Sequence, residues 1–138
     1  MTRVYVDIVG DLFHIGHINL FKKARALFEK PYLIVGVHSD RDVESYKRTP
    51  VICQEQRYEM IRCCRLVDKV IESAPLVITK DYIEQNKIDY VGRGDDFSES
   101  LKIQHEVPIS MKIVKYVEYT KDISTSKIIN KIHSSKTC

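Results

Sequence analysis

Two histidines three residues apart directly follow the first apolar segment of the chain. His14 and His17 lie in the sequence VGDLFHIGH at positions 9–17, where a strand is expected to end and a helix to begin. Residues three apart on a helix face the same way, and Gly16 between them removes a side chain, so a ligand can approach the backbone. The amino end of a helix also attracts phosphate, because its N–H groups and its dipole are positive there. The pattern therefore predicts that both imidazoles contact a phosphate.

Two other interpretations of this histidine pair are open. In the first, His14 caps the helix or packs locally and His17 lies on the solvated face of the helix. In the second, the pair binds zinc, but no third nitrogen, sulfur or carboxylate ligand at a suitable spacing is evident. We therefore predict no metal ion held by the protein alone. The chain contains no Gly-x-Gly-x-x-Gly or Walker loop that would bind phosphate instead.

Short apolar segments alternate along the chain with amphipathic ones. The apolar segments are rich in Val, Ile and Tyr and mostly unbroken, which is typical of buried parallel strands. This alternation predicts an α/β fold, namely a Rossmann-like doubly wound parallel sheet of about five strands flanked by helices. Ligands of such sheets bind beyond the carboxyl ends of the strands, where the strand order reverses. Strands are predicted at 4–9, 32–37, 69–71, 88–91 and 113–117, and helices at 18–29, 40–46, 55–64, 80–86 and 126–133.

Length and composition limit the class of protein. The 138 residues are 43% hydrophobic and 30% charged, which predicts a single domain over residues 1–138. A net charge of +3 is too small for a nucleic-acid surface that relies on charge alone. Neither a signal peptide nor a long apolar run is evident, so we expect a cytoplasmic protein without membrane contact. The four cysteines contain no C-x-x-C pair and are expected to be reduced.

Several segments together resemble the nucleotidyltransferases with the His-x-Gly-His motif, and more narrowly the cytidylyltransferases that act on phosphocholine, phosphoethanolamine or glycerol phosphate. The resemblance runs through nearly the whole chain. It is carried by DLFHIGH at 11–17, YLIVGVHSD at 32–40, Lys47, RYEMIRCCRLVDKV at 57–70, AP at 74–75, KIDYV at 87–91, GDD at 94–96 and ISTSKII at 123–129.

The resemblance implies a CTP-dependent reaction. The phosphate of a small phosphoalcohol attacks the α-phosphorus of CTP, pyrophosphate leaves, and a CDP-alcohol forms. By the same resemblance, His14 and His17 donate hydrogen bonds to the triphosphate, and Lys47 bridges the incoming phosphate and the α-phosphate. Such a transfer needs positioning and charge neutralisation rather than a covalent nucleophile. The resemblance also implies a homodimer, and Mg²⁺ bound mainly through the CTP phosphates.

Further residues receive roles from the same resemblance. Ser124 and Thr125, which would ordinarily cap the last helix, are expected to bind the β- and γ-phosphates. Gly94 and Asp95 are expected at the cytosine pocket, and Arg65 at that pocket or at the dimer contact. The complete expected nucleotide site comprises Val9, Gly10, Asp11, His14, Gly16, His17, Arg65, Gly94, Asp95, Ser124 and Thr125, and the expected acceptor site comprises Asp7, Lys47 and Leu76.

The chain departs from the family pattern at three places. The usual Asp-Gly-x-Phe-Asp is here DIVGD at 7–11, and the usual Arg-Thr-x-Gly is YTKD at 119–122. The second change removes an arginine that grips the triphosphate, and Lys121 or Lys127 is a candidate to compensate. Leu76 stands where phosphocholine enzymes carry a tryptophan, whose ring face stabilises a bound cation by about 0.5–2 kcal/mol.

The loss of that tryptophan favours an acceptor with a primary amine, which can hydrogen-bond to Asp7, or an uncharged glycerol. The sequence therefore predicts a CTP-dependent cytidylyltransferase that acts on phosphoethanolamine. Three alternatives stay open: a glycerol-3-phosphate cytidylyltransferase, suggested by GDDF at 94–97, an adenylyltransferase of the same fold, and a catalytically silent nucleotide-binding module.

Overall fold

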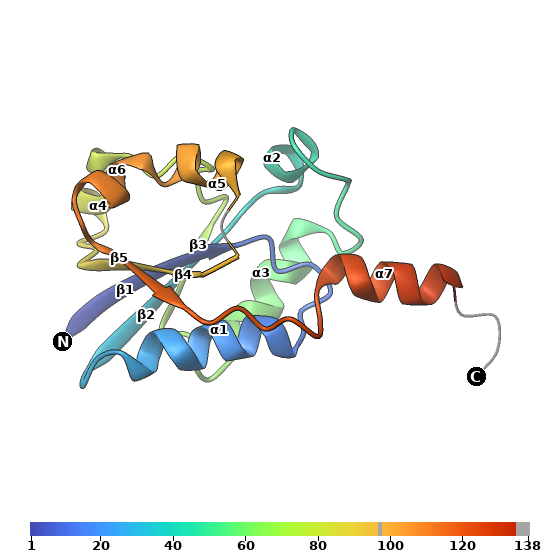
Figure 1. The fold of residues 1–138 in the computed structure, drawn as a ribbon, viewed down its shortest axis with the longest axis horizontal. Helices are drawn as coiled ribbons and strands as arrows, with labels where there is room; N and C mark the ends of the chain where they lie inside the picture. Colours follow the sequence, from blue (N-terminus) through green and yellow to red (C-terminus); the bar gives the residue numbers. More distant parts are fainter. Residues whose placement is uncertain (97, 135–138) are drawn as a thin grey trace.

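The computed structural model describes residues 1–96 and 98–134, and these residues form a five-stranded parallel sheet (Figure 1). The strand order is β3-β2-β1-β4-β5, and every neighbouring pair is parallel. The order therefore reverses between β1 and β4, which is where a ligand cleft is expected. The strands are β1 (Thr2–Ile8), β2 (Pro31–Val37), β3 (Lys69–Glu72), β4 (Tyr90–Gly94) and β5 (Val114–Val117).

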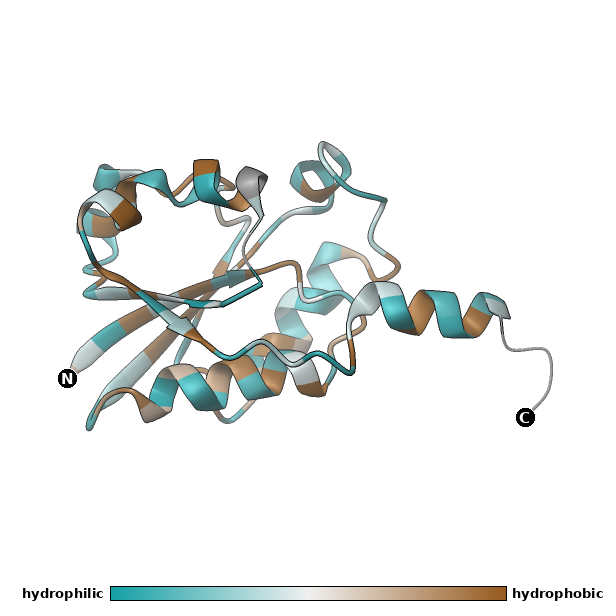
Figure 2. Ribbon diagram, in the orientation of Figure 1, coloured by the Kyte–Doolittle hydropathy of each residue, from teal (hydrophilic) through white to brown (hydrophobic). Residues whose placement is uncertain are grey.

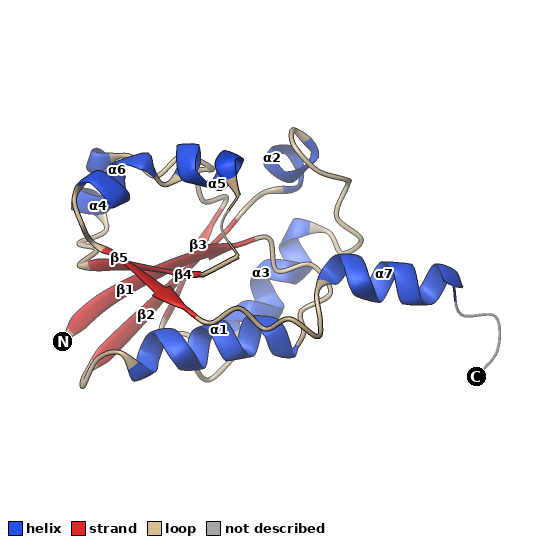
Figure 3. Cartoon of the chain, in the orientation of Figure 1, coloured by secondary structure: helices blue, strands red, loops and turns tan. Residues whose placement is uncertain are grey.

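Helices cover both faces of the sheet (Figure 3). α1 (Ile15–Ala26) and α3 (Gln54–Arg62) cover one face, and α4 (Lys80–Gln85), α5 (Glu99–Gln104) and α6 (Glu106–Ser110) lie over the other. Alternate residues of β1 enter two separate cores, Val4 and Val6 on the α1 side and Tyr5 on the α4 side. Burial on both faces explains why the central strands are unbroken apolar runs. The predicted Rossmann-like α/β fold is confirmed.

Two helices lie beyond the carboxyl ends of the strands, where a ligand would bind. α2 (Asp40–Glu44) follows β2, and α7 (Thr125–Ser134) follows β5 and extends away from the sheet (Figure 1). Apolar and polar residues alternate along α7 (Figure 2), and none of its residues is buried. Its amino end is held against the body of the protein, because Thr125 Oγ1 donates a hydrogen bond to Asp11 O.

The structure shifts some predicted boundaries and adds two helices. The first helix begins at Ile15 instead of 18, because His14 caps it. The fourth strand runs Tyr90–Gly94 instead of 88–91, because Lys87, with φ of 52°, turns the chain and Ile88 N donates to Ile83 O. α5 and α6 were not predicted, since each is too short to show a clear helical period.

Cys53, Cys63 and Cys64 are free thiols, whereas Cys138 and Phe97 lie outside the described residues. Within residues 1–96 and 98–134, no helix combines the length and apolarity needed to cross a bilayer.

Candidate active site

A cleft of about 420 Å³ opens beyond the carboxyl ends of β1 and β4. Its walls come from the turn after β1, the loop after α2, the end of β4, α5 and the segment that leads into α7. Segments far apart in the sequence therefore meet at the point where the strand order reverses. The predicted site residues that line it are Asp7, Val9, Asp11, His14, Gly16, His17, Lys47, Gly94, Ser124 and Thr125.

Two of the predicted site residues that do not line the cleft lie close to it and support its walls. Gly10 has a φ of 72°, and a Cβ there would lie 2.5 Å from Ile61 Cδ1, so glycine is needed for the turn to pack on α3. The exposed carboxylate of Asp95 accepts a hydrogen bond from Tyr119 N at 2.9 Å. Asp95 thereby fixes the segment that leads from β5 to α7.

Arg65 and Leu76 do not line the cleft, and the alternative place of Arg65, at a dimer contact, stays a prediction. Arg65 is exposed in the connection from α3 to the first residue of β3, at the amino edge of the sheet. Leu76 follows β3, which is the outermost strand and two strands away from β1. The segment that carries Leu76 nevertheless lies behind the cleft, because Ala74 O is 3.1 Å from His38 Nδ1 and Ile78 N donates to Gln104 O.

The two histidines form a reciprocal cap at the start of α1. His14 Nδ1 accepts a hydrogen bond from Gly16 N at 3.0 Å, and His17 Nδ1 accepts one from His14 N at 3.1 Å. The ring centroids are 4.0 Å apart. A Cβ on Gly16 would lie 2.7 Å from His14 Cε1, so this glycine makes room for the imidazole rather than for a ligand. His14 and His17 therefore both cap α1 and line the cleft, so the two interpretations of the histidine pair do not exclude each other.

This cap sets the tautomer of both rings. A neutral imidazole whose Nδ1 accepts a hydrogen bond carries its proton on Nε2. Burial lowers the pKa of His14, and burial followed by repulsion from His14 lowers the pKa of His17 to about 3. Both rings are therefore neutral at pH 7, and each keeps an Nε2–H donor. The imidazoles are therefore donors available at this helix end, where Gly16 N and His14 N are already bonded.

The lowered pKa of His17 makes stability depend on pH. Below its ordinary pKa of 6.5, the unfolded chain takes up a proton that the native protein excludes until about pH 3. The free energy of unfolding should therefore fall as pH is lowered through this window, by at most about 1.4 kcal/mol per pH unit for one proton. We expect the urea midpoint to drop between pH 7 and pH 5, and to drop less in His17→Gln. Glutamine can still accept the His14 N–H but does not titrate. Equal slopes in both proteins would contradict this assignment.

Ser124 and Thr125 are held at the amino end of α7, next to the turn after β1. Ser124 Oγ accepts a hydrogen bond from Lys127 N at 3.1 Å, and Thr125 Oγ1 donates to Asp11 O at 2.7 Å. Both hydroxyls line the cleft while serving these contacts. The segment before them is tied to α1, because Asn19 Nδ2 donates to Thr120 Oγ1 at 3.2 Å. The turn after β1 and the start of α7 thus form one continuous surface.

Asp11 has a structural contact as well as a place in the cleft wall. It is 3% exposed, and its two oxygens accept hydrogen bonds from Val51 N at 2.8 Å and Ile52 N at 2.9 Å. These bonds hold the loop that carries Lys47. The Asp11 carboxylate therefore positions a neighbouring loop, and the contact of Asp11 with a nucleotide stays a prediction.

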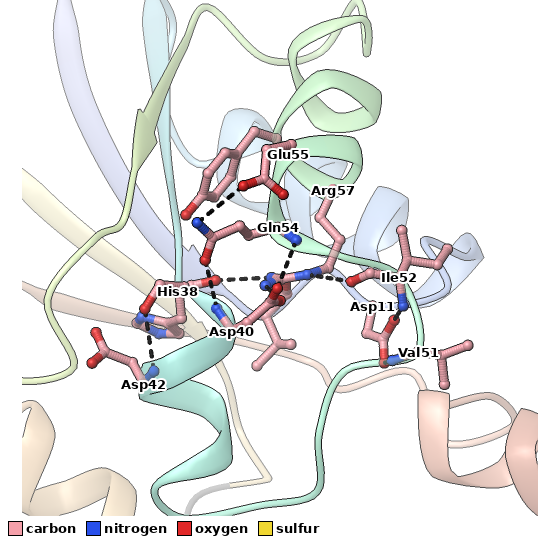
Figure 4. Close-up of polar contacts among 12 residues, drawn as sticks. Asp11, His38, Asp40, Asp42, Val51, Ile52, Gln54, Glu55 and Arg57 are labelled. Atoms are coloured by element: carbon pink, nitrogen blue, oxygen red, sulfur yellow. Dashed lines mark hydrogen bonds and ion pairs between the residues drawn. The ribbon is translucent and has the colours of Figure 1, made fainter.

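Arg57 connects the loops around the cleft, and the sequence analysis assigned it no role. Its guanidinium is buried, donates to Ile52 O and His38 O at 2.9 Å each, and pairs with Asp40 Oδ1 at 2.7 Å (Figure 4). It also donates to Val9 O. Arg57 lies on the same face of α3 as Ile61, so a charged residue on an apolar helix face was the signal available in the sequence.

The floor of the cleft contains a buried carboxylate between two histidines. Asp7 Oδ1 lies 3.2 Å from His105 Nε2, and Asp7 Oδ2 lies 3.5 Å from His38 Nε2. The Nδ1 atoms of these rings face main-chain oxygens, Leu101 O at 3.0 Å and Ala74 O at 3.1 Å respectively. Among the described residues, Asp7 Oδ2 has no hydrogen bond. Neither histidine was predicted, because only the tertiary fold brings them to Asp7.

These contacts fix the charge of the floor. Burial by itself raises the pKa of Asp7, but the hydrogen bond from His105 and the contact with His38 outweigh it and lower that pKa well below its ordinary value. Burial opposes the charge on His38, yet the nearby Asp7 carboxylate raises the pKa of this imidazole above its ordinary value. Asp7 is therefore ionised at every physiological pH, and His38 is a partial counter-charge.

Three other cationic side chains line the cleft among the described residues: Lys47, Arg48 and Arg93. Desolvation by the cleft walls, followed by repulsion from Arg48, lowers the pKa of Lys47. The structure does not bring the compensating lysines expected from the sequence into the lining. Instead, Lys127 Nζ donates to Lys121 O, on the outer side of the turn before α7.

Metal binding by protein side chains alone is not supported in the described part of the chain. No group of three or more His, Cys, Asp or Glu residues there could hold an ion. The carboxylates of Asp7 and Asp11 are committed to the contacts above, whereas Asp96 also lines the cleft. A magnesium ion brought by a triphosphate needs few protein ligands.

Comparisons with known proteins agree with this arrangement. The profile of the family described as cytidylyltransferase-like matches residues 11–131. Choline-phosphate cytidylyltransferase 2 of Arabidopsis thaliana is 37% identical over 142 residues, which cover 95% of this chain and 44% of that protein. Ethanolamine-phosphate cytidylyltransferase of Dictyostelium discoideum is 32% identical over 133 residues, which cover 94% of this chain and 36% of that protein.

A solved structure shares the fold. The lipopolysaccharide core biosynthesis protein of Thermoplasma volcanium superposes with a TM-score of 0.69 at 24% identity, covering 89% of this chain and 99% of that one. A doubly wound sheet with a cleft at its reversal point defines the Rossmann-like class of nucleotide-binding domains. Within that class, the chain belongs to the cytidylyltransferase-like family. It spans less than half the length of the two curated relatives described above.

Proposed function

We propose that this protein transfers CMP from CTP to the phosphate of a small phosphoalcohol, and that the acceptor is phosphoethanolamine. The observation that carries the proposal is the pair of neutral imidazoles with Nε2–H donors at the cleft where the strand order reverses. Membership of the cytidylyltransferase-like family supports CTP as the donor. The relatives named above act, by their names, on choline phosphate and ethanolamine phosphate.

The reaction requires little covalent chemistry from the protein. An oxygen of the acceptor phosphate forms a bond to the α-phosphorus, and the bond from that phosphorus to the bridging oxygen of the β-phosphate breaks. Pyrophosphate leaves with the bonding electrons. His14 and His17 donate Nε2–H to phosphate oxygens on which negative charge increases in the transition state. Lys47 neutralises the two phosphates that must approach each other, which is the positioning work that phosphoryl-type transfer needs.

The acceptor proposal depends on the floor of the cleft. Asp7 is ionised, and its Oδ2 has no hydrogen bond among the described residues. This oxygen is buried beside His38, so Asp7 attracts an ammonium group through its charge. A primary ammonium can approach this charge more closely than a quaternary one, whose nitrogen is surrounded by methyl groups and has no N–H. Leu76, which replaces the tryptophan of phosphocholine enzymes, has no aromatic ring and therefore offers no ring face to a quaternary ammonium group. We therefore place the amine end of the acceptor at Asp7.

Three further parts of the proposal come from the resemblance. Mg²⁺ would be carried by the triphosphate, with Asp96 or Glu118 of the lining as a candidate protein ligand, and it would neutralise charge on the phosphates. We also propose a homodimer and a cytoplasmic location. Light scattering on the purified chain measures the oligomeric state directly.

The central experiment is product analysis by mass spectrometry. The protein is incubated with Mg²⁺, CTP and an equimolar mixture of phosphoethanolamine, phosphocholine and glycerol 3-phosphate, with ATP in a parallel reaction. We expect CDP-ethanolamine as the main product and no AMP adduct. CDP-choline or CDP-glycerol as the main product would overturn the acceptor, and an ADP-alcohol would overturn the donor. CTP binding without any product would indicate a silent nucleotide-binding module.

Gly16→Ala tests whether the placement of His14 matters for this activity. The added Cβ would lie 2.7 Å from His14 Cε1 and 2.9 Å from Nδ1, so the ring must move. Displacements of about 1 Å can cost about 10² in rate, so we expect kcat to fall by this order. Stability should change little, since alanine is the better helix former by about 1 kcal/mol. Lys22→Ala, on the exposed face of α1, is the matched control for kcat and Tm. Full activity in Gly16→Ala would contradict the proposed role of His14.

A further inference from the structure

Arg48 crosses the mouth of the cleft. It lies in the loop between α2 and α3, directly after Lys47, and it lines the cleft. Its Nη1 donates a hydrogen bond to Ser126 Oγ at 3.2 Å, in the first turn of α7. The two residues are far apart in the chain, so only the tertiary fold brings Arg48 to this helix. Its guanidinium is therefore held next to Ser124 and Thr125.

The charges around Arg48 favour the binding of an anion. Within residues 1–96 and 98–134, neither Lys47 nor Arg48 has an acidic side chain within ion-pair distance. The two cations are close enough that Arg48 contributes to the lowered pKa of Lys47. Asp96 also lines the cleft and acts on Lys47, but it is outside ion-pair distance, so the two cations keep charge that attracts a polyanion.

We propose that Arg48 binds the β- and γ-phosphates of the nucleotide and so holds the pyrophosphate leaving group. This inference rests on the proposed function and adds a residue to it. A guanidinium has five N–H donors in a planar fork, of which the contact to Ser126 uses one, so others are available for phosphate oxygens. Lys47 then serves the α-phosphate, while Arg48 and the hydroxyls of Ser124 and Thr125 serve the outer phosphates.

The proposed role of Arg48 predicts which ligands should lose affinity when this residue is replaced. A residue that contacts only the outer phosphates should affect CTP and pyrophosphate but not CMP, which lacks those groups. A residue that merely maintains the loop should affect all three ligands alike. Calorimetric titration of CTP, CMP and pyrophosphate in the presence of Mg²⁺ and without acceptor therefore separates the two roles and does not require turnover.

We expect Arg48→Ala to weaken the binding of CTP and pyrophosphate by about 10- to 100-fold, the usual range for lost charge-assisted hydrogen bonds. CMP binding should be unchanged. Arg48→Lys, which keeps the charge but loses the fork, should give an intermediate loss. Arg41→Ala is the matched control, because Arg41 is exposed on α2 and outside the lining. Lys127→Ala should also leave all three affinities unchanged.

The outcomes distinguish this inference from the proposed function. If Arg48→Ala weakened the binding of CTP and CMP equally, or the binding of neither, the assignment of Arg48 would be wrong. The proposed transferase activity would be unaffected, because it is tested by the product that the wild-type protein forms. If the wild-type protein bound none of the three ligands and formed no CDP-alcohol, the proposed function itself would fall, and the inference with it.

Discussion

Alanine in place of His14 or His17 is expected to lower kcat for CDP-alcohol formation by about 10²–10³, which corresponds to about 2.7–4 kcal/mol of lost transition-state stabilisation. Each ring supplies one Nε2–H donor to a phosphate whose charge increases during the reaction. The loss should appear in kcat more than in the KM for CTP, because these hydrogen bonds strengthen in the transition state. Steady-state rates of pyrophosphate release, measured with saturating acceptor, provide the test.

The histidines also cap α1, so stability must be measured in the same variants. His17→Gln keeps an acceptor for His14 N, which should preserve the helix start while removing the ring. We expect this variant to unfold near the wild-type urea midpoint at pH 7 and still to lose most of the activity. If His17→Gln retained wild-type kcat, the imidazole would have only a structural role, and the proposed mechanism would be wrong.

Replacing Arg57 with methionine is expected to destabilise the protein by about 3–5 kcal/mol. The guanidinium is 1% exposed and satisfies main-chain oxygens from three separate segments, after β1, after β2 and before α3. Methionine fills a similar volume but leaves these carbonyl groups and the Asp40 carboxylate without their donor. The free energy of unfolding, from urea titrations monitored by circular dichroism, measures the effect.

Arg62→Met on the same helix is the matched control for Arg57. Arg62 pairs with Glu59 and Glu72 on the surface, and exposed pairs of this kind stabilise a protein by about 0–1 kcal/mol. We therefore expect a loss of no more than about 1 kcal/mol in Arg62→Met. A loss of similar size in the two variants would show that the buried network around Arg57 contributes no more than a surface ion pair.

Local patterns in the sequence determined the type of fold and the core of the site. Apolar runs and helical periodicity depend on neighbouring residues, so they predicted the five strands, five of the helices and the position of the cleft. The His14–His17 pair was also predictable, because residues three apart on one helical turn must lie together. Boundaries that depend on capping or on a turn, such as the start of α1 and of β4, shifted by two or three residues.

Contacts between distant segments were decided only by the tertiary structure. The burial of Arg57 among three loops, the enclosure of Asp7 by His38 and His105, and the reach of Arg48 to Ser126 all join residues from separate elements. Single residue types carry no information about such pairings, since strand order and loop paths set which side chains meet. The same strand order places Leu76 after β3, an edge strand, and outside the lining of the cleft.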